Sequence, residues 1–270
     1  MIIDIEGIPG SGKTYCAEQK QISIQNALVF YEHTSENIID ITRKAFIPNE
    51  VFDLLIEKIT PRCKLVYGNE YESYGLKKIF SKTTSWNQYK ILSLLEIGYT
   101  DKMLNDEITN LCRYEITCGR VTFEKYQEIA LGLFQQLDDI DVKGKYLIFE
   151  GAFFQNLLFD IIAFYCLDDE KILSFYRELK KVLHNHSVKI TMINVNDVER
   201  CIYQAAAERI NNTPLWIDNF SYWLSHSPYG MKLNLSGIDG VVSFCEELQR
   251  IMILICKSGL FENEIISGRV

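Results

Sequence analysis

The stretch that decides the fold is Gly7-Ile8-Pro9-Gly10-Ser11-Gly12-Lys13-Thr14. It fits the phosphate-binding pattern G-x-x-x-x-G-K-[ST] at every position. Glycines let the backbone curl until successive N–H groups point at phosphate oxygens, and a following helix adds the positive end of its dipole. In such a loop Lys13 neutralises the β- and γ-phosphates and the Thr14 hydroxyl holds Mg²⁺. The sequence therefore predicts a site for ATP and Mg²⁺, built by residues 7–14 with Tyr15 beside them.

The residues on either side of this loop predict a strand before it and a helix after it. Residues 1–5 form a short β-branched run, which is typical of a buried strand. Residues 15–26 have a helix-forming composition, and residues 27–31 are a second short apolar run. Two parallel strands joined by a helix form a βαβ unit. This context favours a phosphate-binding loop over a chance glycine-rich turn.

Strands and helices continue to alternate along the rest of the chain. We predict further strands at residues 145–150, 188–195 and 264–266, and helices at residues 121–137, 153–167, 168–183, 198–210 and 244–256. This alternation indicates an α/β fold, the P-loop NTPase three-layer sandwich, in which helices flank a five-stranded parallel sheet.

Two regions depart from this alternation, and we interpret both as parts of one domain spanning residues 1–270. Residues 35–120 are polar and are punctuated by proline and glycine, which predicts a mostly helical, substrate-binding insertion over the carboxyl edge of the sheet. Residues 197–240 contain arginines and aromatic residues, and we expect a lid there. The part from 220 to 240 is aromatic and turn-rich. It either closes over the ligand or packs as core.

The bulk properties exclude several classes of protein. A net charge of −8 argues against a nucleic acid polymer as partner. The eight cysteines include no Cys-x-x-Cys pair, and several lie in apolar runs, which is typical of reduced thiols. The apolar stretch 147–167 contains Glu150 and Asp160, so we expect no membrane span. With no signal-peptide pattern, these features predict a cytoplasmic protein, either a monomer or a homodimer.

Two glutamates follow predicted strands at the edge where ligands gather in open α/β sheets. Glu150 ends the strand at 145–150, and an acid there holds Mg²⁺ or orients the nucleophile. Its alternative role is to cap the next helix. Glu32 ends the second strand and could accept the proton of an attacking hydroxyl, the alternative being a solvated loop acid. His33, next to it, could compete for the role of base, but we favour a substrate contact, the remaining alternative being a bystander.

Further candidates come from the positive charge and polar groups that phosphoryl transfer requires. Arg209 and Arg200 lie on the predicted helix 198–210 and could stabilise the transferring phosphoryl group, with Arg209 preferred. Each could instead pair with a neighbouring glutamate on the helix surface. Gln155 and Asn156 follow Glu150 closely and could face a polar substrate.

The chain also resembles a known family. Ile5-Glu6-Gly7 followed by residues 9–14 is similar to the opening of the thymidylate kinase and deoxynucleoside kinase group. A bacterial branch of this group shares the run Glu150-Gly151-Ala152-Phe153-Phe154-Gln155-Asn156, and also Tyr229-Gly230 with Gly237-Ile238-Asp239-Gly240. The resemblance covers nearly the whole chain. It implies a general-base role for Glu32, a metal-linked acid at Glu150 and a lid arginine at Arg209.

Two departures from this family bear on the substrate. Gly151 stands where the familiar kinases carry an arginine, and Tyr15 stands where many members carry a hydroxyl residue. We therefore expect a kinase that phosphorylates a hydroxyl of a nucleoside-like or sugar-containing metabolite, such as a natural product or antibiotic. One alternative is a nucleoside or nucleoside monophosphate kinase of primary metabolism. Another is a nucleotide-binding switch or NTPase that acts on a partner protein, although the sequence has no Asn-Lys-x-Asp run, and no Asp-x-x-Gly run follows the predicted strand 145–150.

Overall fold

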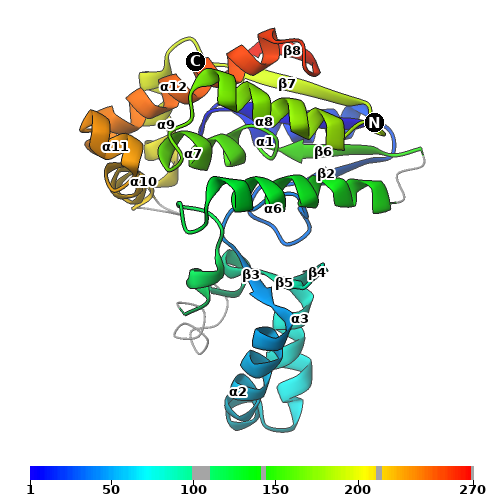
Figure 1. The fold of residues 1–270 in the computed structure, drawn as a ribbon. Helices are drawn as coiled ribbons and strands as arrows, with labels where there is room; N and C mark the ends of the chain where they lie inside the picture. The colour runs from blue at the N-terminus through cyan, green and yellow to red at the C-terminus, as the bar shows by residue number, and fades with distance from the viewer. Residues whose placement is uncertain (99–109, 141–143, 211–214, 269–270) are drawn as a thin grey trace. The chain divides into compact units, whose positions relative to one another are not determined.

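The structure is a computed structural model that describes residues 1–98, 110–140, 144–210 and 215–268. The chain divides into two compact units, Met1–Glu32 with Phe123–Val270, and His33–Thr122 (Figure 1). The second unit nearly coincides with the insertion predicted at residues 35–120. Each unit has its own apolar core, and each is described separately below.

The first unit contains a five-stranded parallel sheet, as predicted. Its strands have the order β2-β6-β1-β7-β8. Their bounds are β1 (Ile2–Gly7), β2 (Ala27–Phe30), β6 (Tyr146–Glu150), β7 (Val188–Asn194) and β8 (Glu262–Ser267). Because β1 is central, with β6 on one side and β7 on the other, the loop that follows it lies where the strand order reverses.

Helices flank this sheet, and their bounds agree with most of the predicted segments. They are α1 (Lys13–Ser23), α6 (Phe123–Gln135), η5 (Gln136–Asp139), α7 (Gln155–Ala163), α8 (Asp169–Val182), α9 (Val198–Arg209), α10 (Trp216–Ser225), α11 (Pro228–Leu233) and α12 (Gly237–Lys257). On α6 the buried residues recur at helical spacing, as the apolar stripe of its sequence indicates. No helix in the described ranges is long and apolar enough to cross a bilayer.

The two faces of β1 carry different chemistry, since alternate side chains of a strand point to opposite faces. Ile3 and Ile5 pack with Ala17 of α1 in one apolar cluster. Asp4 and Glu6 alternate with them and are fully buried. The strand that leads into the glycine-rich loop therefore presents two carboxyl groups to the interior, away from α1.

The prediction that residues 220–240 are turn-rich is wrong. These residues fall mainly in α10, α11 and the first turn of α12, joined by short connections. Phe220 and Leu224 are four residues apart and both are buried, so one helix face is apolar. The Ser227 hydroxyl accepts a hydrogen bond from the Gly230 N–H at 3.0 Å and caps α11, with Pro228 in its first turn.

Trp223, in the aromatic region 220–240, packs against other aromatic rings of the first unit. The Trp223 ring lies 5.4 to 5.7 Å, centroid to centroid, from four phenylalanine rings, those of Phe159, Phe164, Phe220 and Phe244. Edge-to-face and tilted contacts at these distances stabilise packed interiors. Of the two roles left open for this region, packing is the one that Trp223 fulfils.

The second unit combines helices with a three-stranded antiparallel sheet of order β3-β5-β4. Its elements are β3 (Lys44–Pro48), α2 (Asn49–Tyr67), η1 (Gly68–Glu70), the π-helix η2 (Tyr71–Leu76), α3 (Lys77–Ser81), β4 (Thr83–Trp86), β5 (Tyr89–Ser93), α4 (Leu94–Gly98) and η4 (Cys112–Tyr114). Its core includes Ala45, Ile47, Phe52, Ile59 and Leu92. Helices were expected here and the sheet was not.

Candidate active site

The glycine-rich loop connects β1 to α1 in a conformation that needs its glycines. Gly10 and Gly12 have φ of +86° and +97°, a left-handed region that residues with side chains rarely adopt. The Ser11 N–H donates to the Ile8 carbonyl at 3.1 Å, which closes a tight turn. Helix α1 then begins at Lys13. The first N–H groups of a helix have no partner within it, so the loop ends on a helix terminus suited to anions.

Helix α9 packs directly on this loop. A Cβ atom at Gly10 would lie 2.6 Å from the Ala205 Cβ and 3.3 Å from the Cys201 carbonyl oxygen. Real Cβ atoms do not approach a neighbouring carbon that closely. Gly10 therefore serves two purposes, since it permits the turn and it allows α9 to reach the loop.

A pocket of about 210 Å³ opens beside the loop. Its lining comes from five parts of the first unit: the glycine-rich loop, the start of α1, the residues after β2, the end of β6 and one face of α9. The lining residues are Gly10, Gly12, Lys13, Thr14, Glu32, Glu150, Gln204, Ala205, Glu208 and Arg209. The structure thus brings together Lys13, Thr14, both predicted glutamates and Arg209.

Sequence reasoning missed three of these lining residues, Gln204, Ala205 and Glu208. They share one face of α9 with Arg209, because residues four apart in a helix lie one above the other. Helical spacing counted backward from Arg209 would have found them. Arg200 lies one turn further toward the start of α9. It is exposed, and it is not among the lining residues.

Arg209 is held at the end of α9 by two contacts. Its Nη1 donates to the Ala205 carbonyl at 3.2 Å, and its guanidinium carbon lies 4.6 Å from the centroid of the Trp216 ring. A guanidinium over an indole face gains a cation–π attraction. Tyr15, on the outer side of α1, is half exposed and does not line the pocket.

Glu150 and Thr14 form the part of the pocket that could hold a metal ion. The Thr14 hydroxyl donates to Glu150 Oε1 at 2.5 Å. The Glu150 side chain is buried, with 3% of the residue exposed. Burial raises the pKa of Glu150, the nearby Glu32 carboxylate raises it further, and the Thr14 hydrogen bond and the Lys13 charge oppose this only in part. A divalent cation between these groups would relieve the repulsion of the two carboxylates.

Thr14 and Glu150 offer a hydroxyl and a carboxylate oxygen, which are donors that suit Mg²⁺. The described part of the chain contains no group of three or more His, Cys, Asp or Glu residues that could hold a metal ion. Mg²⁺ usually binds to one or two carboxylates and completes its shell with water and substrate phosphates. Thr14 and Glu150 are the residues that would hold it, and a bound Mg²⁺ would supply positive charge to the phosphate oxygens.

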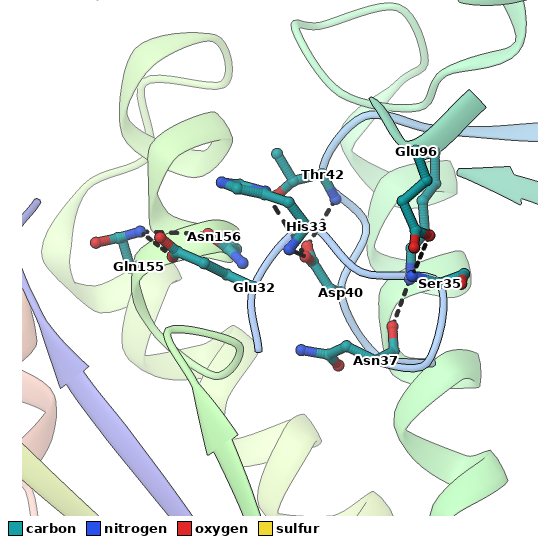
Figure 2. Close-up of polar contacts among 10 residues, drawn as sticks. Glu32, His33, Ser35, Asn37, Asp40, Thr42, Glu96, Gln155 and Asn156 are labelled. Atoms are coloured by element: carbon teal, nitrogen blue, oxygen red, sulfur yellow. Dashed lines mark hydrogen bonds and ion pairs between the residues drawn. The ribbon is translucent and has the colours of Figure 1, made fainter. Parts of the chain in front are cut away.

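Lys13, Gln155 and Glu32 form a hydrogen-bonded chain across the pocket. The Lys13 ammonium is buried and donates to Gln155 Oε1 at 2.8 Å. Gln155 Nε2 in turn donates to Glu32 Oε2 at 2.9 Å, and more weakly to Asn156 Oδ1 at 3.4 Å. Figure 2 shows the Gln155 amide meeting the Glu32 carboxylate, with Asn156 alongside. Of the two polar residues predicted after Glu150, Gln155 therefore contacts both the lysine and the proposed base.

The start of α7, which carries Gln155, is fixed by the buried glutamate of β1. The N–H groups of Phe154 and Gln155 donate to the two carboxylate oxygens of Glu6, at 2.5 and 3.0 Å. A negative charge at a helix N-terminus also gains from the helix dipole. Burial, and then the charge of Glu6, raise the pKa of Asp4 well above its ordinary value. The strand that leads into the loop thus also positions Gln155.

Gly151 leaves room for this chain of hydrogen bonds. Its φ is +65°, and a Cβ there would lie 3.0 Å from Glu32 Oε2 and 3.4 Å from Lys13 Cε. An arginine, which the kinases that the sequence resembles carry at this position, would need a strained backbone and would crowd both side chains. The glycine at position 151 is therefore matched by the local backbone.

His33, predicted as a substrate contact, belongs to the second unit and begins a tight loop there. Its N–H donates to Asp40 Oδ2 at 2.6 Å, and the Thr42 N–H donates to Asp40 Oδ1 at 2.8 Å (Figure 2). Asp40 is fully buried and uses both oxygens to fix the backbone. The Ser35 N–H similarly donates to Glu96 Oε2 at 2.6 Å. A contact between His33 and a substrate stays a prediction.

Comparison with known proteins adds no assignment to this geometry. No family model matches the chain, and no curated protein has significant similarity to it.

Proposed function

We propose that this protein is an ATP- and Mg²⁺-dependent kinase that phosphorylates a hydroxyl group of a small molecule. One observation carries the proposal: Lys13, Thr14, Glu32, Glu150 and Arg209 line the same pocket beside the glycine-rich loop. Phosphoryl transfer requires cations at the phosphate oxygens, a metal site and a base for the attacking hydroxyl. This pocket contains a candidate for each of them.

In the proposed reaction the loop N–H groups and Lys13 bind the β- and γ-phosphates. Glu32 accepts the proton of the acceptor hydroxyl, whose oxygen forms a bond to the γ-phosphorus. The bond between that phosphorus and the β–γ bridging oxygen breaks, and ADP leaves. Arg209 stabilises the charge on the transferring group, while Thr14 and Glu150 hold the metal ion.

For the acceptor we propose a nucleoside-like or sugar-containing metabolite. The support is the neighbourhood of Gly151, where the arginine of the related nucleoside kinases would crowd Glu32 and Lys13. An acceptor here would be held by other contacts, which favours a specialised substrate over a common nucleoside. This step rests on comparison with the family the sequence resembles.

The test is ADP release by the purified protein with ATP and Mg²⁺ against nucleosides, nucleotides, sugars and aminoglycosides. We expect one acceptor class to support turnover, and Lys13→Met to lower it by about 100-fold or more. Lys180→Met is the matched control, because Lys180 is exposed on α8. Strong turnover of a common nucleoside would instead indicate primary metabolism.

Two outcomes would contradict the proposal. If Lys13→Met kept full turnover, the loop would not be the nucleotide site. If ATP were hydrolysed only in the presence of a partner protein and no acceptor were phosphorylated, the protein would be a nucleotide-dependent switch.

A further inference from the structure

The position of Gln155 supports an inference that rests on the proposed function and deepens it. Lys13 and Glu32 carry opposite charges and line one small pocket. The proposed reaction needs them apart, with the lysine on the nucleotide and the glutamate on the acceptor hydroxyl. Direct pairing would occupy both groups and would also stabilise the unprotonated, weakly basic form of the glutamate.

The Gln155 amide satisfies both groups at once. Lysine can only donate and a carboxylate can only accept, so their chemistry fixes which end of the amide faces which partner. Oε1 faces the Lys13 ammonium at 2.8 Å, and Nε2 faces Glu32 Oε2 at 2.9 Å. The residue is 5% exposed, so water competes little for these hydrogen bonds.

The amide cannot easily move away, because its backbone is anchored. Glu6 accepts the Gln155 N–H, and the Asn156 N–H donates to the Gly151 carbonyl at 3.0 Å. A Cβ at Gly151 would lie within 3.6 Å of all three members of the chain: Glu32 Oε2, Lys13 Cε and Gln155 Nε2. Glycine at this position therefore preserves the space in which the amide lies.

We propose that Gln155 is a positioning residue that keeps Lys13 and Glu32 from pairing directly, and so reserves one for the nucleotide and the other for the acceptor. The other charged groups at this pocket are Glu150 from β6 and Glu208 and Arg209 from α9. They remain in place in the variants below, so differences between these variants report on the amide.

The experiment compares the parent protein, Gln155→Leu and the double variant Gln155→Leu with Glu32→Gln. MgATP affinity is measured by calorimetry, with Gln135→Leu as control, since Gln135 is exposed on α6. We expect Gln155→Leu to weaken MgATP binding about five- to tenfold, as Lys13 is drawn to Glu32. Removing the Glu32 charge in that background should restore binding. A purely structural role for Gln155 predicts no such rescue.

A second readout needs no nucleotide. Crystal structures of the parent protein and of Gln155→Leu are compared at the distance between Lys13 Nζ and Glu32 Oε2. We expect the ammonium and the carboxylate to pair directly in Gln155→Leu and to stay apart in the parent protein, where the amide lies between them. General loss of packing does not predict this direct ion pair.

The outcomes separate the two proposals. If the parent protein does not bind MgATP, the proposed function fails, and the distance between Lys13 and Glu32 still tests the role of Gln155. If the parent protein binds MgATP and Lys13→Met does not, the nucleotide site of the proposed function stands. An unrescued Gln155→Leu variant, or a Lys13–Glu32 distance that Gln155→Leu leaves unchanged, would then overturn this inference alone.

Discussion

Glu150 in the first unit and Glu96 in the second show how similar residues serve different ends. Burial and the neighbouring Glu32 raise the pKa of Glu150. Burial also acts to raise the pKa of Glu96, but hydrogen bonds from Lys82 and from Ser35 outweigh it and the net shift is downward. The surroundings of Glu96 thus stabilise its charged form, and those of Glu150 do not. A carboxylate whose negative charge is poorly balanced by its neighbours is a better candidate for a functional role than a carboxylate whose hydrogen bonds stabilise the fold.

The same contrast extends to other carboxylates of the two units. In the second unit Asp40 holds two backbone N–H groups, and Glu115 pairs with Arg43 and Arg120. In the first unit the pocket gathers Glu32, Glu150 and Glu208 beside only two lining cations, Lys13 and Arg209. Positive charge supplied by a metal ion would balance that pocket.

The largest effect is expected from the proposed base. Glu32→Gln keeps the shape of the side chain but cannot accept a proton, so acceptor-dependent ADP release should fall about 10²- to 10⁴-fold. Glu18→Gln, on the exposed side of α1, is the control. Retained turnover in Glu32→Gln would remove Glu32 from the reaction and leave Glu150 as the alternative base.

A buried carboxylate of the second unit should affect stability and not nucleotide binding. Asp40→Ala leaves two backbone N–H groups without their acceptor, which should lower the free energy of unfolding by about 2–3 kcal/mol in urea. MgATP affinity should stay at the parent value. Asp53→Ala, exposed on α2, serves as the reference. If Asp40→Ala left the free energy of unfolding unchanged and weakened MgATP binding, the carboxylates of the second unit would not have the purely structural role inferred for them.

The two arginines of α9 should differ in effect. Arg209→Lys keeps the charge but loses the planar guanidinium, so turnover should fall about tenfold. Arg200→Lys should reduce it less, because Arg200 does not line the pocket. Steady-state rates at saturating ATP measure both. Equal reductions would mean that Arg200 also reaches the transferring group.

The smallest effects are expected from substitutions that test the opposite pKa shifts of Glu150 and Glu96. The pKa of Glu150 is higher in the folded protein than in the unfolded protein. The contribution of this residue to the free energy of unfolding therefore falls as the pH rises through the two pKa values, and at pH 7 the residue destabilises the fold. Without Mg²⁺, Glu150→Gln should therefore stabilise the protein at pH 7 by about 1 kcal/mol. At pH values below the ordinary carboxyl pKa, Glu150→Gln and the parent protein should have equal free energies of unfolding.

Glu96→Gln should have the opposite sign. A lowered folded pKa contributes stability above the unfolded value, and that stability is lost as pH falls. The substitution should therefore destabilise the protein at pH 7. Thermal unfolding of both variants is measured across a range of pH. If both substitutions changed the melting temperature at pH 7 in the same direction, the proposed difference between Glu150 and Glu96 would be refuted.

Most strands of the parallel sheet could be predicted because they contain short runs of apolar, often β-branched residues that end in polar residues. Residues 145–150 and 188–195 follow that pattern and fold as β6 and β7. The antiparallel sheet could not be predicted, because β4 has the sequence Thr83-Thr84-Ser85-Trp86 and lacks apolar alternation. Its pairing with β5 depends on a two-residue turn in which Asn87 has a φ of +49°.

The candidate site was predictable to the extent that its residues follow strands. Glu32 and Glu150 follow predicted strands, and both line the pocket. The hydrogen bonds of Gln155 to Lys13 and Glu32 could not be predicted. They depend on Glu6 of β1, which accepts a hydrogen bond from the start of α7, 148 residues away in the chain. No local pattern carries such a contact.

The contact between Gly10 and Ala205 has a consequence for how this chain can vary. The two Cβ positions would be 2.6 Å apart if Gly10 carried a side chain, so the two sites share one small volume. We expect them to change together in related sequences, with a small residue kept at 205 wherever glycine stands at 10. A relative with a bulky residue at 205 would have shifted α9, and Arg209 with it. Residue 205 is therefore a marker that can sort distant relatives by whether their arginine still reaches the loop.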